Sequence, residues 1–370
     1  MPAAGAERRA WLALVRAPGI GPIRVRRLFD HFGSAAALLD AGPAAWRAAG
    51  LADRYHAALK QPDAAALDAD ERWLAAPGRT FIALDDPRYP QRLREIAAAP
   101  IGLFTLGDIG LLDAPQLAIV GARRATLQAR RDAAAFAAEL VRGGFTVTSG
   151  LATGIDGAAH KGALDAGGTT LAVCANGLDR VYPPRHHELA HAIAERGLLV
   201  SEFPPGVTPR PEYFPRRNRV ISGLSVGVLV VEAARRSGSL ITARLAAEQG
   251  REVFAVPGSI HNPLAQGCHD LIRDGARLVE SAADIFEELG VDPPTAGSAP
   301  ESSASTAPDA LQQRILDALG FEPLALDRLI ERLDVPVGAL HEALLTLELT
   351  GQITSAAGDV LTRLSGKNEV

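Results

Sequence analysis

The sequence contains little of several features that mark particular classes of protein. Two cysteines, Cys174 and Cys268, are too few for a disulfide scaffold or a four-cysteine zinc site. Apolar runs such as Ser225–Val231 are far shorter than the roughly 20 residues of a membrane-spanning helix. Charged residues at positions 7–9 interrupt the N-terminal stretch, which therefore lacks the pattern of a signal peptide. We expect a soluble, cytoplasmic protein without a membrane partner.

Neither sign of charge dominates the chain. The 38 lysines and arginines nearly balance the 43 aspartates and glutamates, which gives a net charge of −5. A globally basic field of the kind that attracts nucleic acid is therefore absent, although a neutral domain can carry a basic patch on one side. The hydrophobic content of 47% excludes a disordered chain, and a length of 370 residues suggests two or three domains.

Four segments differ in composition. Residues 1–113 are rich in alanine and predict an all-α N-terminal domain. Residues 114–290 alternate short β-branched runs with helical stretches, which predicts an α/β domain. Residues 291–310 contain mainly proline, serine and alanine and predict a flexible linker. Residues 311–370 return to a helical pattern and end in short strands, an order that is winged-helix-like.

The middle segment predicts a parallel sheet covered by helices on both faces. The expected strands are Gln116–Val120, Phe145–Ser149, Thr170–Cys174, Leu198–Ser201, Val226–Val231 and Val253–Val256. The expected helices between them are Leu127–Arg142, Ile155–Ala166, His186–Glu195 and Ser239–Gln249. Ligands bind such sheets beyond the carboxyl ends of the strands, so the loops after these strands are the expected site.

The first two loops have the composition of anion-binding turns. Gly121 lets the backbone approach a ligand, and Arg123 and Arg124 supply forked donors for phosphate. A tight turn with solvated arginines is the alternative. The second loop leads into a helix and contributes the candidate residues Ser149, Gly150, Gly154, Asp156, His160 and Lys161. Asp156 could equally be a helix cap or a first-turn acid.

A basic cluster interleaved with aromatic residues follows the fourth strand. Its candidate DNA-binding residues are Phe214, Arg216, Arg217, Asn218 and Arg219. Arginines suit phosphates and rings suit unpaired bases, so this composition favours single-stranded nucleic acid. We assign no helix here, and the alternative is a loop whose aromatic residues fill the core while its arginines pair with Glu202 or Glu212.

The loop after the fifth strand resembles a capped helix start that presents N–H donors to an anion. Its candidates are Ser237, Gly238, Ser239 and Thr242. We expect no metal site, because His187 and His191 have metal-ligand spacing but lack a third ligand. No Ser/His/Asp arrangement can be argued from spacing, so we predict no catalytic residue and no cofactor.

Taken in order, these loops resemble the DNA-processing protein A family, also called DprA or Smf. The stretches that carry the resemblance are AIVGARRAT, TVTSGLATGIDGAAHKGAL, LAVCANGLDRVYPPRHHELA, LLVSEFPPG, YFPRRNRVISGLS, VLVVEAARRSGSLITARLAAEQGREVFAVPGS and LIRDGARLV. They cover about half of the chain. The resemblance implies an extended Rossmann-like doubly wound sheet that binds single-stranded DNA without established catalytic activity.

The resemblance also implies partners and site residues. It implies a homodimer that protects incoming strands during natural transformation and loads the RecA recombinase on them. The arginine of the family's first turn falls on Arg123, where Ala122 replaces a hydroxyl residue of the family. The family's Ser-x-Gly-x-Asn stretch is replaced here by residues 265–269, which weakens any prediction for that loop.

The flanking segments point to interaction modules. Residues 17–23 followed by three arginines resemble a helix-hairpin-helix, whose glycine turn can hold a phosphate or can simply be structural. The expected helix Val337–Leu349 carries no arginine or lysine, so we predict protein contact or regulation rather than base reading for the tail.

A second function remains open in the sequence. The glycine loops also resemble those of phosphoribohydrolases of the lysine-decarboxylase-like type, which hydrolyse nucleotides. Those enzymes carry a Pro-Gly-Gly-x-Gly-Thr loop, whereas this chain has Pro257-Gly258-Ser259. A nucleotide hydrolase is therefore the less favoured alternative.

Overall fold

The computed structural model describes residues 2–292, 309–320, 324–333, 335–356 and 360–364. It divides into two compact units, residues 1–293 and 294–370, which are described separately. The predicted linker 291–310 lies almost entirely outside the described residues. Within the described residues, no helix is long and apolar enough to cross a membrane.

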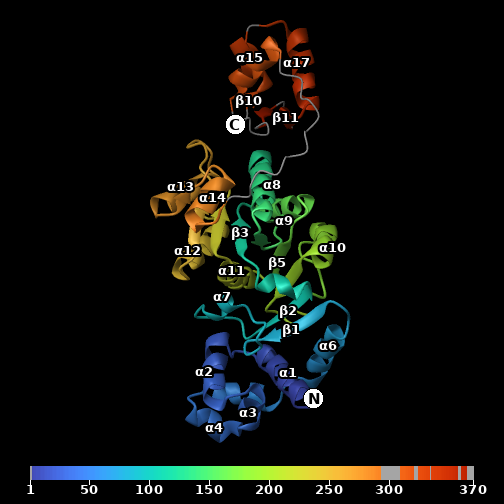
Figure 1. The fold of residues 1–370 in the computed structure, drawn as a ribbon, viewed down its shortest axis with the longest axis vertical. Helices are drawn as coiled ribbons and strands as arrows, with labels where there is room; N and C mark the ends of the chain where they lie inside the picture. Colours follow the sequence, from blue (N-terminus) through green and yellow to red (C-terminus); the bar gives the residue numbers. More distant parts are fainter. Residues whose placement is uncertain (1, 293–308, 321–323, 334, 357–359, 365–370) are drawn as a thin grey trace. The chain divides into compact units, whose positions relative to one another are not determined.

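Short helices form the N-terminal part of the first unit (Figure 1). They are α1 (Pro2–Arg16), α2 (Pro22–Phe32), α3 (Ala35–Asp40), α4 (Gly42–Ala48), α5 (His56–Lys60) and α6 (Ala64–Leu74). Trp11 and Trp46 are completely buried among them. The turn between α1 and α2 passes through Gly19 at φ +77°, a left-handed conformation that favours glycine.

A nine-stranded sheet forms the centre of the first unit. Its strands are β1 (Arg79–Ala83), β2 (Gly102–Gly107), β3 (Gln116–Val120), β4 (Thr146–Ser149), β5 (Thr170–Cys174), β6 (Leu198–Ser201), β7 (Gly227–Val230), β8 (Glu252–Ala255) and β9 (Arg277–Leu278). Their order in the sheet is β1-β2-β6-β5-β4-β3-β7-β8-β9. The strands from β6 to β9 are parallel, whereas β1 and β2 are antiparallel additions at one edge.

The prediction that residues 1–113 are helical throughout is wrong. The strands β1 and β2 lie in this range, and β2 pairs directly with β6. Both contain phenylalanine, threonine and aliphatic residues that suit a strand, but the alanine-rich sequence around them obscured this signal. A domain boundary at residue 113 would therefore cut through the sheet.

Helices cover both faces of the sheet. They are α8 (Leu127–Arg142), α9 (Ile155–Asp165), α10 (His187–Arg196), α11 (Tyr213–Leu224), α12 (Ser239–Glu248), α13 (Gln266–Arg273) and α14 (Ala282–Leu289), and α7 (Gln91–Arg94) lies near α11. Alternate residues of β3 pack into different cores: Leu117 and Ile119 with α8 and α14, and Ala118 and Val120 with α11 and α12. This arrangement confirms the predicted Rossmann-like doubly wound sheet.

The second unit is a small helical domain with a three-stranded sheet. It contains α15 (Ala310–Leu319), β10 (Leu324–Ala325), α16 (Leu326–Leu333), α17 (Val337–Leu349), β11 (Ile353–Ala356) and β12 (Val360–Arg363). The sheet order is β10-β12-β11, with antiparallel pairing. Helices followed by this hairpin confirm the predicted winged-helix-like fold.

Candidate nucleic-acid interface

A cleft lies between the loops after β3 and β7, at the point where the order of strands in the sheet reverses. After β6 the chain crosses back to place β7 beside β3, so the loops after β3 and β7 leave the sheet on opposite sides. The cleft between these loops has a volume of about 710 Å³. It brings together predicted residues from all four loops: Gly121, Arg123, Arg124, Asp156, Phe214, Arg217, Asn218, Ser237, Gly238, Ser239 and Thr242.

Contacts between neighbouring loops hold the loop after β3 in place. The N–H of Ala122 donates to the carbonyl of Glu232 at 2.7 Å, and the Glu232 carboxylate accepts from the Thr126 N–H at 2.9 Å. Gly154 has φ +83°, and a Cβ atom there would lie 2.1 Å from the Ala122 carbonyl oxygen. The loop that presents Arg123 is therefore fixed before any ligand arrives, which lowers the entropic cost of binding.

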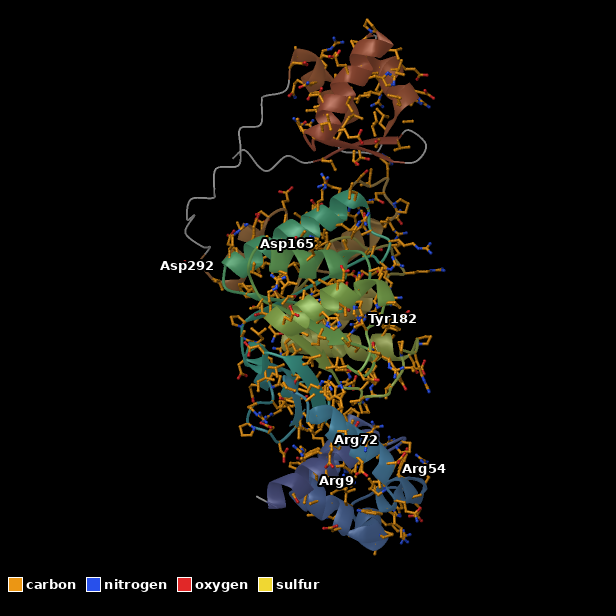
Figure 2. All side chains as sticks on the ribbon, turned by 90° about the vertical axis from the view of Figure 1, so that its right-hand side faces the viewer. Arg9, Arg54, Arg72, Asp165, Tyr182 and Asp292 are labelled. Atoms are coloured by element: carbon orange, nitrogen blue, oxygen red, sulfur yellow. The ribbon has the colours of Figure 1, made fainter. Side chains whose placement is uncertain are left out.

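Arginine and aromatic side chains alternate along one wall of the cleft. The Arg123 guanidinium lies 5.0 Å from the centre of the Phe214 ring, and this ring lies 5.7 Å from that of Tyr182. Tyr182 is 42% exposed and stands at the surface of the first unit (Figure 2). Arg123 and Arg124 are exposed and have no carboxylate partner among the described residues, so their charges are available to a ligand.

A smaller hollow of about 170 Å³ adjoins the cleft. It shares Arg123, Phe214 and Tyr182 with the cleft, and Arg185 lies on its far side. The shared wall is thus the meeting point of two connected hollows. An aromatic surface flanked by guanidinium groups can stack a planar base while it neutralises a phosphate.

A buried pair of opposite charges lies at the base of the cleft. Arg217 donates to the carbonyls of Gly150 and Val173, and Asp156 accepts from the N–H groups of Gly150 and Ala152, both at 3.2 Å. Burial raises the pKa of Asp156, although Arg217 and these N–H groups oppose that shift. Burial likewise lowers the pKa of Arg217. Both side chains hold the loop after β4 in shape. Asp156 lies in the first turn of α9, as one of the two alternatives predicted, and it does not cap the helix.

The start of α12 forms the opposite wall. The hydroxyls of Ser237 and Ser239 lie 2.7 Å apart, and the side-chain amide of Asn218 donates to the Gly238 carbonyl at 3.3 Å. Thr242 follows one turn later at the cleft surface. Asn218 therefore joins α11 to α12 across the cleft and fixes the distance between the two walls.

Of the predicted residues of the second loop, only Asp156 lines the cleft. His160 is completely buried, and its Nδ1 lies 2.7 Å from the Thr170 hydroxyl. Burial lowers the pKa of His160 to about 3, so the ring is neutral. Lys161 is 72% exposed and pairs at 2.8 Å with Asp165, which lies apart from Tyr182 in Figure 2. The buried Ser149 hydroxyl donates to the Ile119 carbonyl at 2.6 Å and is likewise a structural contact.

Arg216 and Arg219 lie on the other side of α11 from the cleft. Both donate to the same carboxylate oxygen of Glu202, at 2.8 and 2.5 Å. The prediction of no helix here is wrong, and the helix explains the separation. Residues 214, 217 and 218 share one face of an α-helix, whereas 216 and 219 share another. For these two arginines, the alternative that they pair with Glu202 is correct.

Sequence reasoning did not include two polar side chains that line the cleft among its candidates. Arg236 lies at the start of the α12 wall, and Tyr182 comes from a loop between β5 and α10. Arg236 immediately precedes the predicted Ser237–Ser239 stretch, so its position offered a usable signal. Tyr182 offered none, because its contact with Phe214 depends on the order of strands in the sheet. The described residues contain no cluster of three or more potential metal ligands.

Family models match three parts of the chain. The model described as DNA recombination-mediator protein A matches residues 80–290, which is more than half of the chain. The chain belongs to this family. A DprA-like N-terminal helix-hairpin-helix model matches residues 5–69, and the DprA winged helix model matches residues 299–359. These matches confirm the resemblance to DprA and the predicted helix-hairpin-helix and winged-helix modules.

Several DprA and Smf proteins are similar to this family member. Protein Smf of Escherichia coli is 46% identical over 77% of this chain and 78% of its own length. The X-ray structure of DprA from Streptococcus pneumoniae has a TM-score of 0.68 and 35% identity, covering 76% of this chain and 97% of that one. A structure of DprA from Helicobacter pylori, concerned with its single-stranded DNA binding mode, has a TM-score of 0.52 and 30% identity, covering 57% of this chain and 95% of that one.

Proposed function

We propose that this protein binds single-stranded DNA in the cleft between the loops after β3 and β7. The observation that carries the proposal is the wall on which the guanidinium of Arg123 lies 5.0 Å from the Phe214 ring, with Tyr182 next to it. An unpaired strand presents both a charged backbone and free base faces, and this wall offers a partner for each. The single-stranded DNA binding mode described for the Helicobacter pylori relative supports the same ligand.

The predicted residues divide into two proposed roles. Arg123, Arg124 and the newly found Arg236 are proposed phosphate contacts, and Phe214 with Tyr182 is the proposed stacking surface. Other predicted residues, in the cleft or beside it, shape the cleft. Those that act through backbone position or hydrogen bonds are Gly121, Ser149, Gly150, Gly154, Asp156, Arg217, Asn218, Ser237, Gly238, Ser239 and Thr242.

The cellular role in the proposal follows from the family. The family description as a recombination mediator supports a non-catalytic part in transformation-related recombination, in which the protein loads RecA on bound strands in the cytoplasm. The proposal includes a homodimer, which light scattering on the purified protein tests. It includes no cofactor.

Titration of labelled single-stranded and duplex oligonucleotides across a salt series tests the binding proposal. We expect tight, strongly salt-dependent binding to the single strand and much weaker binding to a duplex of equal length, because phosphates and base faces both contribute. Equal affinity for both would contradict the stacking role. Release of free base from a nucleoside monophosphate would instead support the nucleotide hydrolase.

A further inference from the structure

A second hollow lies on the side of α11 that faces the N-terminal helices. It has a volume of about 500 Å³ and is bounded by the turn between α1 and α2, by Ala98 and by α11. Three arginines line it: Arg24, Arg216 and Arg219. We propose that this hollow, here called the hairpin pocket, binds a phosphate of the same DNA strand that occupies the cleft. This inference rests on the proposed function and extends the path of the strand.

The charges around the hairpin pocket are unbalanced. Arg216 and Arg219 share the single buried carboxylate of Glu202. Arg24 lies 5.0 Å from the Tyr55 ring and contacts the Gly19 carbonyl, and it has no carboxylate partner among the described residues. The three guanidinium groups that line the pocket therefore have one carboxylate partner between them. The excess positive charge favours a phosphate, to which a guanidinium presents paired donors.

The walls of the hairpin pocket are held together independently of any ligand. Arg26 of α2 donates to the Arg94 carbonyl of α7 at 2.9 Å. Arg219 of α11 donates to the Ala98 carbonyl, four residues further along the same segment. The segment from α7 to Ala98 thus joins the N-terminal helices to α11. Because the walls of this pocket are already joined, few side chains or loops need to become ordered when a phosphate binds, so the loss of conformational entropy is small.

The hairpin pocket and the cleft lie on different faces of α11, and both reach the first turn of this helix. Pro215 lines the cleft and Arg216 lines the hairpin pocket, and Cα atoms of consecutive residues are only about 3.8 Å apart. Arg216 also lies over the Phe203 ring at 5.2 Å, and that ring stacks on Tyr213 at 4.4 Å. A strand that leaves the cleft across this end of the helix reaches the pocket within a short distance. Ile23, which is 62% exposed at its edge, offers an apolar contact to a sugar or base.

A length series of oligothymidylates separates the hairpin pocket from the cleft. The test variant is Arg24→Ala, and the matched control is Arg54→Ala. Arg54 is also exposed and lies over the Tyr55 ring at 4.8 Å, but it does not line the pocket. The substrates are an oligomer of about 20 nucleotides, longer than the roughly 4–16 that one groove covers, and the shortest oligomer that the wild-type protein binds.

We expect Arg24→Ala to weaken binding of the long oligomer about three- to tenfold and to leave the shortest one unaffected. Its salt dependence should become shallower by about 0.7, the contribution of one phosphate on a single strand. Arg24→Lys keeps the charge and should restore most of the slope. Arg54→Ala should match the wild type at both lengths, and all variants should keep the wild-type melting temperature.

Three outcomes would overturn the inference. One is equal binding of the long oligomer by the Arg24→Ala and Arg54→Ala variants, and another is an equal loss at both oligomer lengths. A third is a loss for duplex DNA but not for the single strand. If the wild-type protein binds no oligothymidylate of any length, the proposed function itself fails, and that result is distinct from all three.

Discussion

The substitution Arg123→Ala should strongly weaken DNA binding without unfolding the protein. Arg123 is exposed, and its one described side-chain contact is the cation–π contact with Phe214 at 5.0 Å. Loss of an exposed contact of this type costs about 0.5–1 kcal/mol of folding free energy. No buried carboxylate is left unpaired, so the melting temperature should fall by only a few degrees.

The loss in DNA affinity should be much larger than the loss in stability. Hydrogen bonds to charged groups contribute about 1.5–3 kcal/mol each, which corresponds to roughly 10- to 150-fold in the dissociation constant. The slope of log affinity against log salt should also fall by about 0.7, because one phosphate contact is lost. Fluorescence anisotropy with a labelled oligothymidylate measures both quantities.

A matched control makes this test decisive. Arg142→Ala removes the same charge from the opposite end of α8, away from the loop that carries Arg123. It should bind DNA like the wild type. The reasoning is refuted if Arg123→Ala and Arg142→Ala bind equally well, or if Arg123→Ala unfolds at a much lower temperature, since Arg123 would then be a structural residue.

Four other changes to the chain test particular contacts. Phe214→Ala should weaken single-strand binding by about 1–3 kcal/mol, whereas Phe214→Trp should retain it; equal titrations for the two would exclude stacking. Gly154→Ala should destabilise the protein by more than about 3 kcal/mol in urea denaturation, because the new Cβ atom would collide with the Ala122 carbonyl. The control is Gly167→Ala, which is also at positive φ but has open space around it and should cost only about 1–2 kcal/mol. The pKa of His160 is about 3 in the folded protein, whereas that of an unperturbed histidine is 6.5. As the pH falls, the unfolded chain therefore takes up a proton before the folded protein does. The free energy of unfolding should decrease by up to about 1.4 kcal/mol per pH unit below pH 6.5. His160→Gln should flatten that dependence in unfolding experiments between about pH 6.5 and 4.5, whereas the exposed His31→Gln should not. A protein of residues 1–293 alone should bind single-stranded DNA with a dissociation constant within about twofold of that of the full chain, because α17 carries no arginine or lysine. A large loss of affinity would show that the second unit contributes to binding.

Much of the sheet could be predicted from local sequence. The range Gln116–Val120 coincides with β3 and Thr170–Cys174 with β5, because a strand buried on both faces is a short continuous apolar run. The strands in the alanine-rich N-terminal segment were more difficult to predict. There β1 and β2 form an antiparallel pair within a largely helical composition, and only the pairing of β2 with β6 gives this pair a place at the edge of the sheet.

The candidate site was predicted as a set of loops, but not as a set of contacts. Local composition placed Arg123 and Phe214 among the candidates because arginine and aromatic residues suit a single strand. The same reasoning grouped Arg219 with them, although its side chain is only 11% exposed and neutralises Glu202. Whether an arginine meets solvent or a buried carboxylate depends on its helix face, and the helix itself was not predicted.

Local sequence was enough to predict the central strands, most of the helices around them and the loops that form the proposed binding site, because hydrophobic periodicity and glycine positions are local properties. Which side chains share the cleft depends instead on long-range packing. The reversal of strand order places β7 beside β3, and this brings Arg236 near Arg123 and excludes Lys161. The rotation of about 100° per residue along α11 then separates its side chains into one group that lines the cleft and another that lines the hairpin pocket.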